Sequence, residues 1–310
     1  MKLAIMIEGQ NGLNWPRWQE IARMVEALGF EGLFRSDHFT NAEPPDLDSL
    51  ELWTSLTWLA SHTGRIAFGP LVTPVSFRHP ALTARIAAAV DDLSNGRLVL
   101  GLGAGWQERE HDKFGFDLLD LDERFTRFEE GIRVIKALLG SDQPTNFQGK
   151  YYDLKEAVLL PRPQRPGGPP ILIGGNGPKY TLPLAARYAD EWNAVYLMPE
   201  QLKELNARLD ELIEAEGRSP EDVRRSMMAG IVYAPERSEL ERKVEKRTNG
   251  KRSVEDLRSH GVVIGNAEEV VDQLKRIEAV GLDRVMLQWL DLEDLDGLEG
   301  LAESVLPSFS

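Results

Sequence analysis

The stretch "LGLGAGWQEREHDKFG", residues 100–115, joins an apolar run with three alternating glycines to a charged segment around one histidine. A dinucleotide-binding fold needs a third glycine where Trp106 stands, and a P-loop ends in Gly-Lys-Ser or Gly-Lys-Thr. The acidic residues and His111 also lack the His-Glu-x-x-His spacing of a helical zinc site. Two interpretations remain: a strand whose glycines let a neighbour pack closely, or a strand end where Gly103 and Gly105 bring backbone N–H groups to a planar cofactor.

Apolar runs of strand length alternate with helix-like segments on both sides of this stretch. Eight runs predict strands: 2–7, 31–38, 65–72, 97–105, 171–175, 191–197, 224–234 and 284–290. Nearly continuous apolar strands indicate parallel strands that are buried on both faces. The first turn, "EGQNG" (8–12), lacks the Gly-x-Gly-x-x-Gly of an open dinucleotide-binding sheet. The sequence therefore predicts an α/β protein with a closed (β/α)8 TIM barrel.

Two segments interrupt the alternation of strands and helices. The Pro- and Gly-rich segment 146–170 follows the fourth strand and helix and predicts an irregular excursion with a small hairpin. The segment 235–260 is charged and poorly periodic, so we expect an insertion before the seventh helix. Because α/β barrels of this length commonly form one domain, we predict a single domain over residues 1–310.

The composition excludes several classes of protein. The 310 residues include no cysteine, which excludes disulfides, thiolate catalysis and cysteine-ligated metal centres. The net charge of −14 disfavours a nucleic-acid partner. No uncharged apolar run approaches the ~20 residues of a membrane span, and the N-terminal run reaches Glu8 too early for a signal peptide. We therefore expect a cytoplasmic protein that acts on a small molecule, without a membrane or nucleic-acid partner.

The chemistry of a barrel lies at the carboxyl ends of its strands. The second strand ends in "RSDHF" (35–39), where the imidazole of His38 is suited to proton exchange. An Asp37–His38 pair that caps a loop is the alternative. The fifth strand ends in "ILIGGNGPKY" (171–180), whose glycines open a helix and form a candidate anion site. Trp289, near the end of the last strand, is either core or a substrate contact, and no set of residues predicts a metal site.

Five segments, taken in order, resemble the luciferase-like monooxygenase superfamily, and above all its deazaflavin (coenzyme F420)-dependent oxidoreductases. They are "SDHF" (36–39), "TPVSFRHP" (73–80), "GRLVLGLGAGWQEREHDKFG" (96–115), "ERFTRFEEGIRVIKALL" (123–139) and "ILIGGNGPKYTLPLAARYADEWN" (171–193). The resemblance covers nearly the whole chain and is weakest over 235–260. The ordered set is specific, whereas each motif alone is common.

The resemblance implies a flavin-like ring in the mouth of the barrel. His38 would face the reaction centre as general acid and base, and Asp37 would contact the cofactor. A non-prolyl cis peptide bond that supports the ring would fall at Pro70–Leu71, with Thr73 nearby. The other implied cofactor-binding residues are Gly103, Ala104, Gly105, Arg109 and Glu110 along the ring and tail, and Gly174, Gly175, Asn176 and Gly177 at a phosphate. Trp106 and Trp289 are the candidate substrate contacts.

The resemblance therefore implies a hydride transfer between coenzyme F420 and a small alcohol, carbonyl compound or activated alkene. The first alternative is an FMN-dependent monooxygenase, in which reduced flavin activates oxygen, and the second is a non-catalytic flavin-binding barrel. Sugar-phosphate dehydrogenases of the superfamily carry an acidic residue where Trp106 stands and a tryptophan where Ala42 stands, so the resemblance does not extend to their substrate. A homodimer is the habit of the superfamily.

Overall fold

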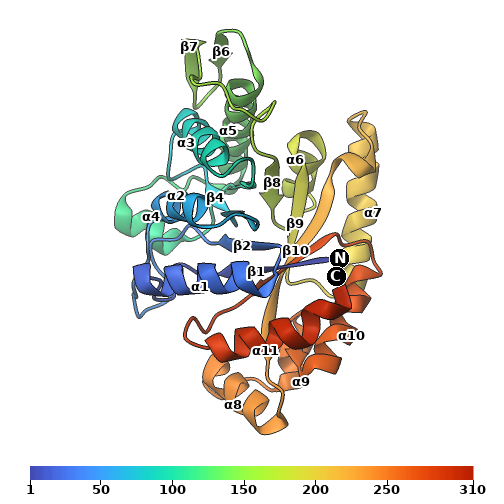
Figure 1. Cartoon of the computed structure of the whole chain (residues 1–310). Coiled ribbons are helices and arrows are strands. Elements are labelled where there is room, and N and C mark those ends of the chain that lie inside the picture. The colour runs from blue at the N-terminus through green and yellow to red at the C-terminus, as the bar shows by residue number, and fades with distance from the viewer. Residues whose placement is uncertain (310) are drawn as a thin grey trace.

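Parallel strands form a nearly closed barrel in the computed structural model, which describes residues 1–309 (Figure 1). The barrel strands are β1 (Lys2–Ile7), β2 (Gly32–Arg35), β3 (Ala67–Pro70), β4 (Thr73–Pro74), β5 (Leu100–Gly103), β8 (Ile171–Gly174), β9 (Glu191–Val195), β10 (Arg224–Tyr233) and β12 (Arg284–Gln288). Their order is β3-β2-β1-β12-β10-β9-β8-β5-β4, with parallel pairing throughout. The wall closes where Val99 N donates to Phe68 O at 2.8 Å. The predicted α/β barrel is confirmed.

Helices follow the strands and surround the barrel (Figure 1). They are α1 (Trp15–Leu28), α2 (Leu52–His62), α3 (Pro80–Leu93), α4 (Glu108–Phe114), α5 (Leu121–Gly140), α6 (Thr181–Tyr188), α7 (Pro199–Ala215), α8 (Arg237–Thr248), α9 (Val254–Ser259), α10 (Ala267–Glu278) and α11 (Leu295–Val305). Local signals set their ends. In α1, the Asn14 side chain accepts from Arg17 N at 3.2 Å, and the helix stops at Gly29, whose φ of 93° is costly for other residues.

The strand predicted over 65–72 is interrupted, since β3 pairs with β2 whereas β4 pairs with β5. The non-prolyl cis peptide bond lies in this interruption, at Leu71–Val72, so the prediction of Pro70–Leu71 is wrong by one residue. The Leu71 N–H still donates to Arg35 O at 2.7 Å. The Pro70–Leu71 peptide therefore belongs to the ladder with β2, and the chain turns away only at the next bond.

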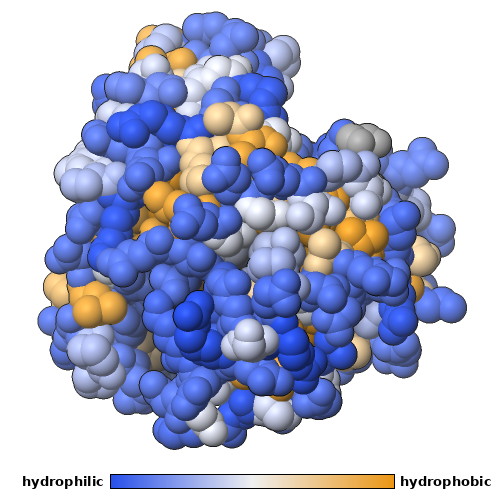
Figure 2. Space-filling model, turned by 60° about the horizontal axis from the view of Figure 1, so that its bottom comes forward, coloured by the Kyte–Doolittle hydropathy of each residue, from blue (hydrophilic) through white to orange (hydrophobic). Residues whose placement is uncertain are grey.

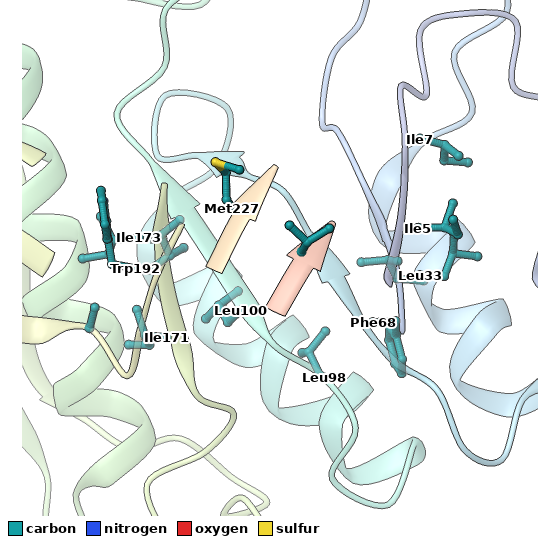
Figure 3. Close-up of a cluster of buried hydrophobic side chains, with 14 of the residues drawn as sticks. Ile5, Ile7, Leu33, Phe68, Leu98, Leu100, Ile171, Ile173, Trp192 and Met227 are labelled. Carbon is teal, nitrogen blue, oxygen red and sulfur yellow. The ribbon is translucent and has the colours of Figure 1, made fainter. Parts of the chain in front are cut away.

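The barrel strands alternate between two cores because successive side chains point to opposite faces of a strand. Along β1, Ile5 and Ile7 belong to the large outer core between strands and helices, and Met6 belongs to a small core inside the barrel. Figure 3 shows strand residues of the outer core, among them Leu33, Leu100 and Trp192. The inner core consists of Ala4, Met6, Phe34, Leu71, Val99, Leu172 and Met286. It forms the floor on which any ligand at the carboxyl ends of the strands rests.

Two excursions leave the barrel at opposite sides (Figure 1). The predicted small hairpin is confirmed, because β6 (Thr145–Gln148) and β7 (Asp153–Ala157) pair in antiparallel orientation. The segment 235–260 lies between β10 and α10 and folds as α8 and α9, with a short additional strand, β11 (Val263–Gly265), alongside β10. It has a small core of its own, formed by Val232, Ala234, Leu240, Val244, Val254, Leu257, Val262 and Ile264.

The face of the molecule shown in Figure 2 is mostly hydrophilic, with hydrophobic residues in separate patches. Within residues 1–309, no helix combines the length and the apolar character that crossing a bilayer requires. The same residues hold no group of three or more His, Asp or Glu side chains arranged for a metal ion.

Candidate active site

A cavity of about 380 Å³ opens at the carboxyl ends of the barrel strands. Since all barrel strands run in the same direction, the residues after each strand meet at this rim. The lining residues are Met6, Glu8, Ser36, Asp37, His38, Leu71, Val72, Pro74, Gly105, Trp106, Glu110, Gly174, Gly175, Asn193, Val195 and Met228. The cavity therefore combines an apolar floor with a few acidic and polar groups, as is typical of a small-molecule site.

His38 is oriented by a buried carboxylate. Its Nδ1 lies 2.7 Å from Oε1 of Glu110, whose other oxygen accepts from Phe39 N at 2.8 Å. Nδ1 is engaged by Glu110, so Nε2 is the ring nitrogen left to the cavity. Burial lowers the pKa of His38, but the hydrogen bond and charge of Glu110 outweigh it and leave this pKa raised. Trp106 packs edge-on against the imidazole, with ring centroids 5.7 Å apart, and is 62% exposed at the rim.

Asp37, next to His38 in the chain, is held by two side-chain donors. Its Oδ2 accepts from Thr73 Oγ1 at 2.7 Å and from Arg78 Nη1 at 2.6 Å. Arg78 also bonds Glu51 at 2.9 Å, which ties the β4–α3 loop to the start of α2. Asp37 is 5% exposed and is held at the edge of the cavity by an ion pair and a hydroxyl donor.

The alternating glycines of the 100–115 stretch support both interpretations given above: some allow close packing of a neighbour, and one lies at the cavity. A Cβ on Gly103 would lie 2.5 Å from Val72 Cγ2, and one on Gly101 would lie 2.1 Å from Pro70 O. These two glycines therefore make room for the interrupted third strand. Gly105 has φ 87° and lines the cavity itself. The strand packs closely in its middle and opens to the cavity at its end.

The glycine-rich loop after β8 lies at the opposite wall. The Asn176 side chain donates to Val195 O at 2.7 Å and accepts from Val195 N at 2.9 Å, so it fastens the loop to the end of β9. Within the part of the chain that the structure describes, Gly177 O accepts from Thr181 N and Leu182 N, but no protein acceptor meets the N–H groups of Asn176 and Gly177. These donors precede α6 and suit an anion.

The structure brings only part of the predicted residues to the cavity. Those that line it are Asp37, His38, Leu71, Gly105, Trp106, Glu110, Gly174 and Gly175. Four predicted residues are next to lining residues in the chain without lining the cavity themselves: Pro70, Thr73, Gly103 and Ala104. Asn176 and Gly177 follow the lining residues Gly174 and Gly175 in the loop after β8. Arg109 bonds both oxygens of Asp46, at 2.7 and 2.9 Å. Trp289 lines a different cavity, beside α8.

Several lining residues were not singled out from the sequence. Asn193 and Met228 sit within strands and carry no motif. Glu8 directly follows the first strand, and the rule that barrel chemistry lies after the strands could have found it. Val72 lines the cavity because β3 ends at Pro70 and the chain turns before β4 begins at Thr73.

Residues 1–261 match the family described as luciferase-like monooxygenase, which is most of the chain. The chain belongs to this family. Among its luciferase-like relatives is an F420-dependent glucose-6-phosphate dehydrogenase of Microbacterium testaceum, 31% identical over 219 residues. That match covers 69% of this chain and 63% of the relative, so it spans less than two thirds of the relative's length.

Other members of the luciferase-like family use a different cofactor. An FMNH2-dependent dimethylsulfone monooxygenase of Pseudomonas fluorescens is 25% identical over 328 residues, covering 96% of this chain and 87% of the relative. Among solved structures, an F420-dependent secondary alcohol dehydrogenase in complex with an F420-acetone adduct superposes with a TM-score of 0.86. The two chains are 20% identical, and the match covers 100% of this chain and 99% of the alcohol dehydrogenase. At this identity the similarity shows the fold alone.

Proposed function

We propose that this chain is an oxidoreductase that transfers a hydride between coenzyme F420 and a small organic alcohol, carbonyl compound or activated alkene. The observation that carries the proposal is the His38–Glu110 pair at 2.7 Å, which leaves a proton-exchanging nitrogen facing the cavity. The F420-dependent relatives support the choice of cofactor.

The residues present fit a planar cofactor with an anionic tail. Leu71, Val72 and Gly174 form an apolar and glycine-lined wall for a ring, and no lysine or arginine crowds the cavity lining within residues 1–309. The open N–H groups of Asn176 and Gly177 before α6 suit a phosphate. When bound, the deazaflavin supplies the hydride acceptor or donor, and the protein supplies orientation and proton transfer.

In the proposed reaction, His38 exchanges a proton with the oxygen of the substrate through Nε2. Glu110 holds Nδ1 and stabilises the imidazolium when Nε2 takes up the proton. The raised pKa of His38 keeps the imidazolium available near neutral pH for the reduction of a carbonyl group. Trp106 shields this proton transfer from water on one side of the ring.

The competing function is oxygenation with reduced FMN. It is supported by the dimethylsulfone monooxygenase, whose match extends over 96% of this chain. The cavity lining suits either ring, so the cofactor has to be decided by binding. A non-catalytic flavin-binding barrel would bind a ring as well, but it would not need the imidazole of His38.

The deciding experiment is a parallel titration of the purified protein with coenzyme F420 and with FMN, followed by protein fluorescence. We expect tight binding of F420 and weak binding of FMN, for the wild type and for His38→Ala alike. Preference for FMN would overturn the proposal in favour of oxygen chemistry. If F420 binds, a screen of alcohols and carbonyl compounds follows, and unchanged turnover by His38→Ala would refute the assigned role of His38.

We also propose that the protein is a homodimer, which is the common oligomeric state in the superfamily. Light scattering of the eluting protein measures its mass directly, and a mass near 35 kDa, that of one chain of 34.8 kDa, would contradict it.

A further inference from the structure

Glu8 is a carboxylate that faces the cavity and forms no ion pair within residues 1–309. It follows β1, and its two oxygens accept from Gln288 Nε2 at 2.6 Å and from Gln10 Nε2 at 2.9 Å. Neutral amides hold this carboxylate, and no lysine or arginine of residues 1–309 forms an ion pair with it. Each oxygen keeps a lone pair for a further donor.

The two amides are turned toward Glu8 by hydroxyl groups behind them. Tyr196 OH donates to Gln288 Oε1, and Ser36 Oγ donates to Gln10 Oε1 at 2.7 Å. An amide has one acceptor end, so a hydroxyl donor at the oxygen leaves the NH2 group to point at the carboxylate. Glu8 is thereby held in one orientation from two sides.

Tyr196 is itself held by a contact with the inserted segment 235–260. It follows β9 with φ 53°, a left-handed conformation that non-glycine residues adopt at a cost. Arg247 of α8 donates to Tyr196 OH at 3.4 Å. A Cβ on Gly230 would lie 2.8 Å from the Tyr196 ring, and one on Gly261 would lie 2.8 Å from Tyr196 O. Gly230 in β10 thus makes room for the ring of Tyr196, and Gly261 after α9 makes room for its backbone.

The three acidic side chains at the cavity differ in whether a basic side chain forms an ion pair with them. Asp37 is paired with Arg78, and Glu110 with His38, whereas Glu8 has only amide partners. A phosphate that entered beside Glu8 would meet a negative charge that no ion pair neutralises, since the buried Arg35 acts on Glu8 by charge alone and is hydrogen-bonded to Ser36, Ser55 and Leu50. A hydroxyl group would find a carboxylate acceptor with a free lone pair, and a hydrogen bond to a charged acceptor is stronger than one to a neutral acceptor.

We propose that Glu8 binds a hydroxyl group of an uncharged substrate and rejects phosphorylated substrates, and that Tyr196 and Gln288 are the residues that position it. The proposal rests on the function proposed above and defines the substrate class of the same site. The Trp106 and Ala42 departures from sugar-phosphate dehydrogenases point in the same direction.

The positioning role is tested by NMR titration of His38 in the protein without cofactor or substrate. The charge of Glu8 is one of the influences on the pKa of His38, after burial and Glu110, and it acts to raise this pKa. We expect Glu8→Gln to lower the His38 pKa and Tyr196→Phe to lower it by a smaller amount. Tyr188→Phe, which removes a hydroxyl bonded to Glu129 far from the cavity, is the matched control. Equal values for Tyr196→Phe and the control would overturn the positioning role.

The substrate class is tested with F420 and matched pairs of compounds: glucose and glucose 6-phosphate, and glycerol and glycerol 3-phosphate. For the wild type we expect kcat/KM for the uncharged member to exceed that for the phosphorylated member. Glu8→Gln should lower kcat/KM for the uncharged compound by about 10- to 100-fold, mainly by raising KM. The ratio of kcat/KM between the uncharged and the phosphorylated compound should therefore decrease. Preference of the wild type for the phosphorylated members would refute this proposal while the proposed function stands. Failure to bind F420 would instead refute the proposed function, and the His38 titration would still test Glu8.

Discussion

Gly103→Ala tests whether the glycines of β5 support the cavity wall. The added Cβ would lie 2.5 Å from Val72 Cγ2, whereas ordinary carbon–carbon contacts lie at about 3.5–4.0 Å. Val72 must therefore move by about 1 Å. A Cβ on Gly101 or on Gly174 would lie 3.1 or 3.2 Å from Val72, so the valine is already close to both strands. It has room to move only toward the cavity that it lines.

The cost of this movement follows from known cases of overpacking. Inserting a methyl group into a packed region costs about 1–3 kcal/mol in unfolding free energy. With an unfolding entropy of about 2.1 cal/mol/K per residue, a chain of 310 residues would lose about 2–5 °C in Tm. Because the wall shifts into the cavity, we also expect the Kd for F420 to rise about tenfold, which corresponds to about 1.4 kcal/mol.

Thermal unfolding and fluorescence titration of F420 measure both effects on the same preparation. Gly140→Ala is the matched control, because Gly140 ends α5 with no atom within 4 Å of an added Cβ. It should be neutral or stabilising by up to about 1 kcal/mol. A Gly103→Ala protein with wild-type Tm and wild-type F420 affinity would refute the argument that Val72 is confined between the glycines.

Three further predictions concern the polar groups. His38→Ala should lower kcat by about 10²–10⁴-fold with F420 affinity retained, as single-turnover kinetics and titration would show; a KM effect alone would contradict the acid–base role. The His38–Glu110 pair should stabilise the fold most between pH 4.5 and 6.5, the ordinary pKa values of the two groups. Because the pKa of His38 is raised, this stability is lost as pH rises through the pKa of His38 in the folded protein. Because the pKa of Glu110 is lowered, the stability is also lost as pH falls through the pKa of Glu110 in the folded protein. Urea midpoints of the wild type and Glu110→Gln should differ most inside this window, and a pH-independent difference would argue against the charge pair. Asn176→Ala removes both hydrogen bonds to Val195 and should cost about 1–3 kcal/mol and weaken F420 binding; weakened binding without lost stability would indicate direct contact instead.

The barrel could be predicted because its signals are local. Apolar strands alternate with helical segments, and several helices carry a local capping residue, such as Asn14 and Gly29 of α1. The helices α8 and α9 in the segment 235–260 were not predicted, since each contributes only two residues to the small core that they share with β10 and β11. The cis peptide bond was misplaced by one residue because hydrogen bonding of Leu71 to β2 decides where the third strand ends.

The fold class, the excursions and the candidate His38 follow from the sequence, because strand periodicity and the position of a residue after a strand are local properties. Which groups meet at the cavity depends on the tertiary structure. Glu110 reaches His38 across 72 residues, and Gln288 reaches Glu8 across 280 residues. Such contacts depend on how the closed barrel brings the ends of β1, β2, β5 and β12 to one rim, and no spacing in the sequence encodes which side chains meet there.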